Sequence, residues 1–172
     1  MSRHFFALWP DEDTRENIAA VCQQLPEKYG RVITPQNLHI TLAFLGSIDS
    51  EQALRLREGA ASARGTGFTL TLERLGWWKR PGVAWIAPEL TPAALLGLVG
   101  SINHLIQGHG IVPDSRLFQP HLTIARKVKR APEHVEFAPI KWKISSFCLA
   151  RSNTLPAGAV YEVIETWPLS SA

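Results

Sequence analysis

The sequence contains little of what would commit it to a membrane, a disulfide framework or a metal centre. Its two cysteines, Cys22 and Cys148, form no CxxC motif, which argues against a disulfide framework and a structural zinc site. We expect both to be buried as small apolar side chains. No apolar run approaches the roughly 18 residues of a membrane span, and the N-terminal run is too short for a signal peptide. We therefore expect a cytoplasmic protein without a membrane partner.

Neither sign of charge dominates the chain. Lys and Arg number 18 and Asp and Glu number 15 among 172 residues, giving a net charge of +3. This mild excess permits a polyanionic partner, but the lack of a long basic run argues against extensive duplex binding. The GxxxxGK phosphate loop, the GxSxG elbow and the GxGxxG fingerprint are all missing. The composition is that of an ordinary globular protein, and we expect one domain over residues 1–172.

What the sequence does contain is a short motif that occurs twice. Both copies read His, apolar, Thr, apolar, Ala; His39 and Thr41 belong to the first, His121 and Thr123 to the second. The two histidines are 82 positions apart, close to half the chain. Apolar residues alternate with polar ones in both copies, which is typical of a half-buried strand. Each His and its Thr should therefore project from one face, about 7 Å apart.

Two imidazoles and two hydroxyls in one site can divide the work of a phosphoryl transfer. One neutral imidazole can accept a proton from the attacking water, and the other, protonated imidazole can donate its proton to the leaving oxygen. The Thr hydroxyls can donate to phosphate oxygens. This chemistry requires no metal or cofactor and suits a strained cyclic phosphate. A lone His in an apolar strand more often has a structural role than a functional one. Because the motif occurs twice, a functional site shared by the two histidines becomes about as well supported as a structural role. A zinc site of His39, His121 and an acid has no ExxH or HxxE spacing to support it.

Two further features accompany the second motif. Arg126 can add a charge-assisted hydrogen bond to a phosphate, but in a regular strand its parity is opposite to that of His121 and Thr123. It reaches their face only past the strand end or at a bulge. Trp77-Trp78-Lys79-Arg80 is expected at a turn. It either stacks bases and attracts phosphate or places one Trp in the core with its charges in solvent, and we favour the second interpretation. The other histidines lack such partners and are interpreted as surface or helix residues: His4, His104, His109 and His134.

The remaining periodicity predicts three helices and several short strands. The helices are expected over 11–25, 49–61 and 91–107. Beside the two motif strands, further strands are expected over 4–9, 68–72, 83–87, 141–150 and 160–167. The pair 68–72 and 83–87 is predicted to form one hairpin, and the last two strands another. Strands and helices do not alternate strictly, so a simple parallel sheet is not expected. The repeat near the midpoint predicts two similar lobes facing each other across a cleft.

These features together resemble the 2H phosphoesterase superfamily, and within it the bacterial and archaeal RNA 2′,3′-cyclic phosphodiesterases, also called 2′-5′ RNA ligases. Residues 37–46, NLHITLAFLG, and 118–126, FQPHLTIAR, resemble its two signature strands. Residues 3–8 resemble its opening strand, and Tyr161 with 167–169 its final one. The resemblance implies an α+β fold of two pseudo-symmetric lobes, each with an antiparallel sheet and helices on its outer face, and a central cleft carrying the two HxTx strands.

The resemblance also implies metal-independent hydrolysis of RNA 2′,3′-cyclic phosphate ends to 2′-phosphates, without a cofactor. By similarity, His39 donates the proton and His121 accepts it, while Thr41, Thr123 and Arg126 bind the substrate. An RNA 5′-hydroxyl in place of water gives reversible 2′-5′ ligation. The implied partner is RNA with cyclic phosphate ends, tRNA fragments included, and the implied state is a monomer. The residues alone leave open which His is the acid. A hydrolase of a small cyclic nucleotide-type phosphate and a non-catalytic binder of such RNA ends remain alternatives.

Overall fold

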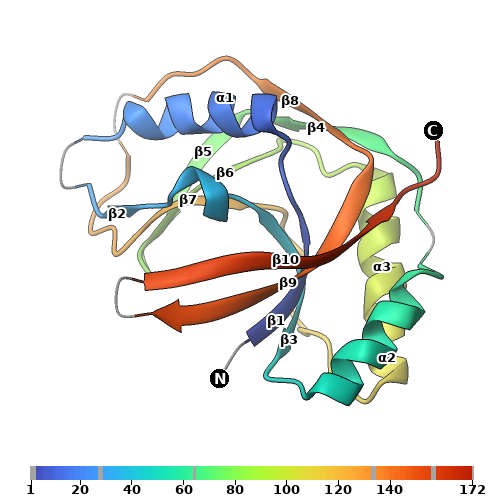
Figure 1. The fold of residues 1–172 in the computed structure, drawn as a ribbon. Helices are drawn as coiled ribbons and strands as arrows, with labels where there is room; N and C mark the ends of the chain where they lie inside the picture. The colour runs from blue at the N-terminus through green and yellow to red at the C-terminus, as the bar shows by residue number, and fades with distance from the viewer. Residues whose placement is uncertain (1–2, 27–28, 64, 133–134, 156–157, 172) are drawn as a thin grey trace.

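The structure, a computed structural model, describes residues 3–26, 29–63, 65–132, 135–155 and 158–171. Within them the chain forms three α-helices and a short 3-10 helix: α1 (Glu12–Gln23), α2 (Ser50–Ala60), α3 (Ala93–Gly108) and η1 (Pro35–Asn37). The strands are β1 (Arg3–Leu8), β2 (Arg31–Val32), β3 (Ile40–Gly46), β4 (Phe68–Leu72), β5 (Arg74–Trp78), β6 (Val83–Ala87), β7 (Leu122–Arg126), β8 (Ile140–Ile144), β9 (Ser146–Leu155) and β10 (Gly158–Pro168). Figure 1 shows α1 on one side of the molecule and α2 with α3 at the other.

The strands form two antiparallel sheets. The main sheet has the order β10-β9-β1-β3-β7-β6-β5, with β2 also paired to β7, and β4 pairs with β8 in a small second sheet. The predicted α+β class with antiparallel sheets is confirmed. The sheets of the two expected lobes are continuous, because β3 and β7 are hydrogen-bonded neighbours at the centre. A central cleft stays a prediction.

A pseudo-two-fold relation runs through the middle of the main sheet. β3 and β7 begin directly after His39 and His121, and they are joined where Ile40 pairs with Leu122. These two residues hold the same place in the repeat, as a two-fold axis requires. Outward from the centre, β3 pairs with β1 and β7 pairs with β6, and a long helix connects the strands of each pair. The sequence repeat thus becomes two similar units that meet at their motif strands.

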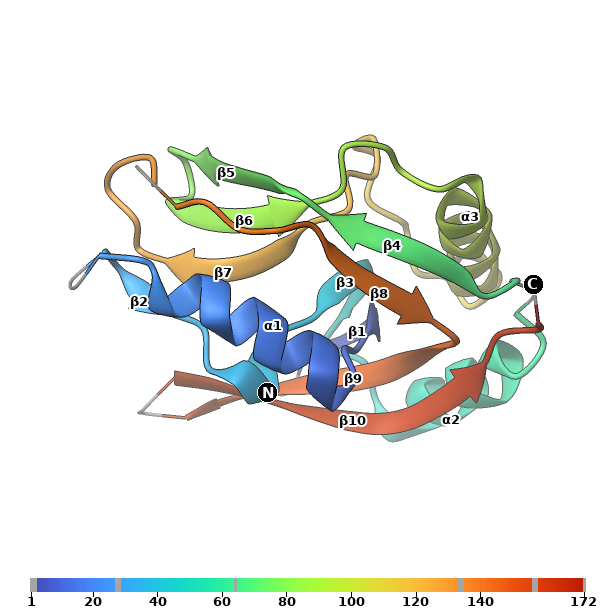
Figure 2. The same ribbon diagram turned by 90° about the horizontal axis from the view of Figure 1, so that it is seen from above.

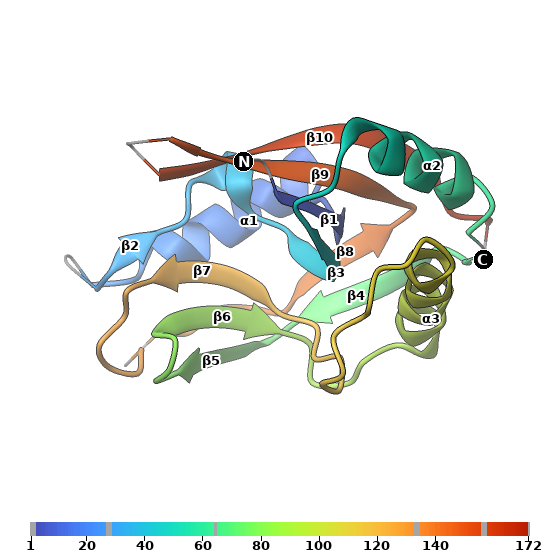
Figure 3. The ribbon, with the colours of Figure 1, turned by 90° about the horizontal axis from the view of Figure 1, so that it is seen from below.

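The helices begin at capping residues and bury their apolar faces. Asp11 Oδ1 accepts a hydrogen bond from Thr14 N at 2.8 Å, and Asp49 Oδ1 accepts one from Gln52 N at 2.7 Å, which satisfies otherwise unpaired N–H groups. α3 packs against β3 and α2, whereas α1 lies along β8. Figures 2 and 3 show α1 apart from the α2–α3 pair. No helix in the described ranges is long and apolar enough to cross a membrane. Cys22 and Cys148 are buried and free, as predicted.

The predicted hairpin of β4 with β6 is wrong. β6 pairs with β5, whereas β4 pairs with β8. Trp77 and Trp78 belong to β5, so the turn is confined to residues 79–82. Gly76 and two adjacent indoles resemble a turn in sequence. In the strand, however, Gly76 provides space, because a Cβ there would lie 2.2 Å from the Trp85 ring.

The predicted single strand over 141–150 is two strands in different sheets. β8 pairs with β4, and β9 pairs with β1 and β10. Trp142 and Ile144 are buried at even positions, while Phe147 is buried at an odd one. One regular strand cannot bury both parities on one face, so the chain changes sheets at Ser145. The predicted hairpin of this segment with 160–167 is confirmed by the pairing of β9 with β10.

Candidate active site

The same local contact fixes both motif histidines. Each lies directly before its strand, with its ring Nδ1 close to the backbone oxygen two residues upstream. The distances are 2.7 Å from His39 to Asn37 O and 2.8 Å from His121 to Gln119 O. A carbonyl oxygen only accepts, so Nδ1 carries a proton and donates it to this bond. In the neutral rings, Nε2 is therefore the nitrogen left to accept a proton.

Three aromatic rings surround His39. Trp9 stacks on it with ring centroids 5.2 Å apart and planes 8° apart, Phe5 lies at 4.9 Å, and Tyr161 meets it edge-on at 5.0 Å. Tyr161 belongs to β10, which is tied to the motif because Asn37 Nδ2 donates to a β10 carbonyl at 2.9 Å. This enclosure removes water from the ring. Burial, with smaller contributions from nearby cations, lowers the pKa of His39 to about 4.

The surroundings of His121 are different and come from β5 and β6. Trp78 meets its ring with centroids 4.6 Å apart and planes at 72°, and Trp78 in turn contacts Trp85 at 5.3 Å. Burial first, and the charge of Arg126 second, lower the pKa of His121. Trp77 packs against the main hydrophobic core instead. The favoured interpretation, one Trp in the core, thus holds for Trp77, and base stacking by Trp78 stays a prediction.

A bulge turns Arg126 toward the histidines. In the register of β7 against β6, Ile124 is an extra residue between Thr123 and Ala125. Such a bulge reverses the alternation of side chains beyond it. Ile124 and Ala125 are accordingly both fully buried, and Arg126 is partly exposed like Thr123. The parity that argued against Arg126 is thus corrected within the strand.

The first motif contains the same bulge. Leu42 is the extra residue between Thr41 and Ala43 in the register of β3 against β1. The repeat therefore extends beyond the motif letters to a matching irregularity of the backbone. Phe44, which is 66% exposed, holds the place in β3 that Arg126 holds in β7. The two halves of the site consequently differ in charge: only the second supplies a cation at this position.

Arg126 and the two threonines are the other residues predicted for the site. After burial, the charge of Arg126 contributes to lowering the pKa of both His39 and His121, which places its guanidinium within electrostatic reach of both. Thr41 and Thr123 are partly exposed, and each lies two residues beyond its His on the same side of the strand. Neither hydroxyl bonds to another residue in the described part of the chain. They are thus available to a ligand. No group of three or more potential metal ligands was found among the described residues.

Sequence reasoning missed most of the aromatic surroundings. Trp9 and Phe5 looked like parts of an apolar strand, and no periodicity distinguishes a ring that covers a histidine from a core residue. His4 is not a surface or helix residue, because it lies buried in β1 at 7% exposure. His104 and His109 lie on and at the end of α3, as predicted, and His134 lies outside the described residues.

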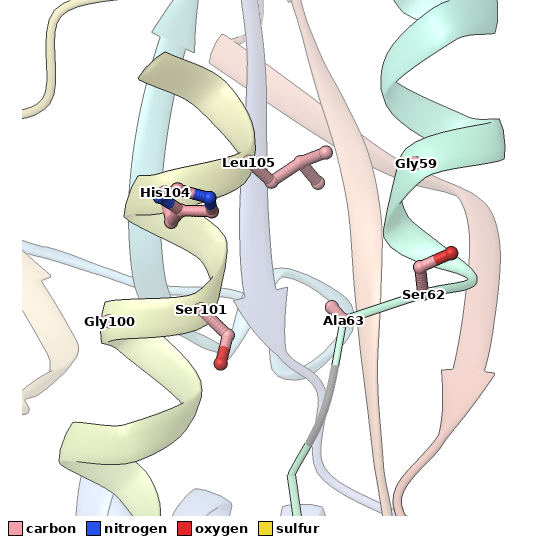
Figure 4. Close-up of a pocket in the computed structure, with 7 residues that line it drawn as sticks. All are labelled: Gly59, Ser62, Ala63, Gly100, Ser101, His104 and Leu105. Carbon is pink, nitrogen blue, oxygen red and sulfur yellow. The ribbon is translucent and has the colours of Figure 1, made fainter. Parts of the chain in front are cut away.

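A hollow of about 490 Å³ lies elsewhere, between α2 and α3 (Figure 4). Small and apolar side chains dominate its lining: Gly59, Ser62, Ala63, Gly100, Ser101, His104 and Leu105. It contains no residue of either motif. This hollow therefore belongs to the packing of the helices rather than to the candidate site.

An antiparallel α+β fold with two HxT strands paired at its centre defines the class, a 2H-type phosphoesterase fold. A family model described as LigT like Phosphoesterase matches residues 8–85. The RNA 2′,3′-cyclic phosphodiesterase of Escherichia coli K12 is 32% identical over 173 residues, covering 98% of this chain and 97% of that protein. The Thermotoga maritima protein of the same name is 27% identical over 175 residues, with 94% and 92% coverage. The crystal structure of E. coli LigT complexed with 3′-AMP has a TM-score of 0.85, 31% identity and 98% coverage of each chain. The chain belongs to the LigT-like phosphoesterase family.

Proposed function

We propose that the protein hydrolyses RNA 2′,3′-cyclic phosphate ends to 2′-phosphates by metal-independent acid–base catalysis with two histidines. The observation that carries this is the pairing of Ile40 with Leu122. It brings the residues after His39 and His121 together, so both imidazoles stand at the centre of one sheet with Nε2 available. Relatives covering nearly the whole chain carry the name RNA 2′,3′-cyclic phosphodiesterase, which supports this substrate.

The proposed reaction assigns one proton transfer to each ring. His121 Nε2 takes a proton from water as its oxygen attacks phosphorus, and the bond from phosphorus to O3′ breaks. His39 Nε2–H gives its proton to O3′, which leaves a 2′-phosphate and a 3′-hydroxyl. Thr41 and Thr123 donate to the non-bridging oxygens, and Arg126 offsets their negative charge. With an RNA 5′-hydroxyl in place of water, the same steps form a 2′-5′ linkage.

The low pKa of His39 sets a condition on this assignment. At about 4 in the free protein, most of the His39 rings are neutral at pH 7. A phosphate anion beside the ring favours the imidazolium, so His39 acquires its proton in the substrate complex. The burial that lowers the pKa also makes the protonated ring a strong donor once it forms.

The assay uses an RNA oligonucleotide with a 2′,3′-cyclic phosphate end, with EDTA present, and identifies the product. A 2′-phosphate supports the proposal. A 3′-phosphate contradicts the roles of the two histidines. Turnover of a nucleoside 2′,3′-cyclic phosphate without turnover of the RNA indicates a small-molecule hydrolase, and binding without turnover indicates a binding module. A fragment of tRNA with a cyclic end is a natural second substrate. Since both motifs come from one chain, we expect a monomer to be active.

A further inference from the structure

The residue opposite Arg126 is another arginine. β2 pairs with β7, and Arg31 stands directly across from Arg126, so both side chains project from the same face. Arg31 is exposed, whereas Arg126 is partly buried near the histidines. Like charges directly opposite each other destabilise a sheet. A bound anion would relieve this repulsion.

More cations gather at the same end of the main sheet. The β5–β6 turn is held against the segment that follows β7 by a hydrogen bond from Val128 N to Gly82 O at 3.0 Å. Figures 2 and 3 show β2, the end of β7 and the β5–β6 turn together at one end of the molecule. We call this set the cationic end; its residues are Arg31, Lys79, Arg80, Arg126, Lys127, Lys129 and Arg130.

Described carboxylates do not neutralise the cationic end. None of its residues forms an ion pair with a described Asp or Glu, whereas six other arginines do: Arg15, Arg55, Arg57, Arg74, Arg116 and Arg151. The sequence has no acidic residue within 29–33, 79–85 or 126–132. A chain with a net charge of only +3 thus collects a large share of its cations beside the candidate site, without an ion pair to any carboxylate that the structure describes.

We propose that the cationic end binds the phosphodiester backbone of the RNA strand whose cyclic end occupies the site, with Arg31 contacting the first phosphate beyond the one held by Arg126. This rests on the proposed function. Backbone phosphates are contacted mainly by Arg and Lys without regard to sequence, and the planar guanidinium fits phosphate oxygens. A mononucleotide has no second phosphate to offer. The cationic end therefore selects RNA ends over small cyclic nucleotides.

The first experiment compares two substrates, a nucleoside 2′,3′-cyclic phosphate and a single-stranded RNA of about ten nucleotides with the same end. The wild type should have the higher kcat/KM on the RNA. Arg31→Ala should lower kcat/KM on the RNA by about tenfold, the value of one charged hydrogen bond, and change it less than about twofold on the mononucleotide. The double variant Lys79→Ala/Arg80→Ala should show the same split.

Lys141→Ala/Lys143→Ala is the matched control. Like Lys79→Ala/Arg80→Ala, it removes two positive charges, here from exposed positions of β8 in the small sheet. It should leave kcat/KM unchanged on both substrates. Equal losses on the two substrates, no loss on either, or a comparable loss in the control contradicts the cationic end as a binding surface. If the wild type turns over neither substrate, the proposed function fails instead.

A binding measurement tests the cationic end without turnover. The affinity for a 2′-phosphate-ended RNA is followed by fluorescence anisotropy at several salt concentrations. Each lost phosphate contact should reduce the slope of log K against log[salt] by about 0.7, in Arg31→Ala and not in the control. An unchanged slope overturns the proposal, as does equal competition by an acidic polypeptide.

Discussion

At the scale of single residues, two histidines with nearly the same sequence context have different environments. His39 is enclosed by Trp9, Phe5 and Tyr161, whereas His121 has Trp78 at its edge. Burial lowers both pKa values, and that of His39 falls to about 4. The motif letters are too alike to predict this difference. It arises because Phe5 of β1 and Tyr161 of β10 contact the His39 ring, whereas Trp78 of β5 contacts the His121 ring.

The pH dependence of catalysis follows from these directions. The reaction needs one protonated and one neutral imidazole, and kcat/KM reports the free protein. Because both pKa values lie below the ordinary 6.5, we expect a bell whose maximum lies on the acid side of 6.5. The rate should decline from pH 6.5 to 8.5 as the required proton is lost. A steady rise over that range in kcat/KM would show that no imidazolium takes part.

The same burial makes stability depend on pH. The folded-state pKa of His39 is lowered from 6.5 to about 4. The neutral ring therefore makes its full contribution to the free energy of unfolding above pH 6.5, and this contribution is lost as the pH falls toward 4. Between pH 7 and 4.5 the wild type should lose about 2 kcal/mol of unfolding free energy more than His39→Asn. Urea unfolding at the two pH values measures this difference, and equal losses contradict a His39 ring that stays neutral in the folded protein.

At the scale of elements, each motif is a strand with a bulge at its fourth position. The extra residues, Leu42 and Ile124, follow the threonines at equivalent places. On the far side of each bulge stand Phe44 and Arg126. At this equivalent position the first motif strand carries an aromatic ring and the second carries a cation, although the two strands share the bulge.

The packing of the Trp85 ring against Gly76 in the neighbouring strand can be tested by substitution. A Cβ on Gly76 would lie 2.2 Å from the Trp85 ring, which contacts Trp78 and, through it, His121. Gly76→Ala should therefore cost about 1–3 kcal/mol of unfolding free energy by overpacking and also lower kcat/KM.

Gly97→Ala is the control, because its Cβ would meet nothing within 4 Å on an exposed helical position. It should gain up to about 1 kcal/mol from helix propensity and keep full activity. If Gly76→Ala has the same free energy of unfolding and the same kcat/KM as the wild type, the packing of Trp85 does not hold Trp78 against His121. Urea unfolding and steady-state kinetics provide both readouts.

At the scale of the whole molecule, the two units meet at a single registered pair, Ile40 with Leu122, both fully buried. Leu122→Ala should cost about 2–5 kcal/mol, as a cavity in a core does. It should also lower kcat/KM at temperatures where the protein is folded, because the pair sets one histidine against the other. Leu95→Ala, equally buried on α3, should lose similar stability but keep kcat/KM. Equal kinetic losses in the two variants would refute a special role for the junction.

Much of the arrangement could be predicted from the sequence because its signals are local. Helix caps at Asp11 and Asp49 and the period of two around His39 and His121 each depend on a few neighbouring residues. The pairing of β4 with β8 could not be predicted, since alternation marks a strand without naming its partner. The parity of Arg126 did predict a position past the strand end or at a bulge, and the register of β7 shows the bulge. The even-to-odd change between Ile144 and Phe147 was a second local signal, and it marked the break between β8 and β9.

The central claim, that His39 and His121 transfer the protons, is tested most directly by replacing each with Ala and measuring kcat on the cyclic-phosphate RNA. The kcat of each variant should fall by about 10²–10⁴-fold, while circular dichroism and urea unfolding at pH 7 show a folded protein. His104→Ala, on the exposed side of α3, should keep the wild-type rate. Retention of activity by either His39→Ala or His121→Ala in a folded protein would contradict the two-histidine mechanism.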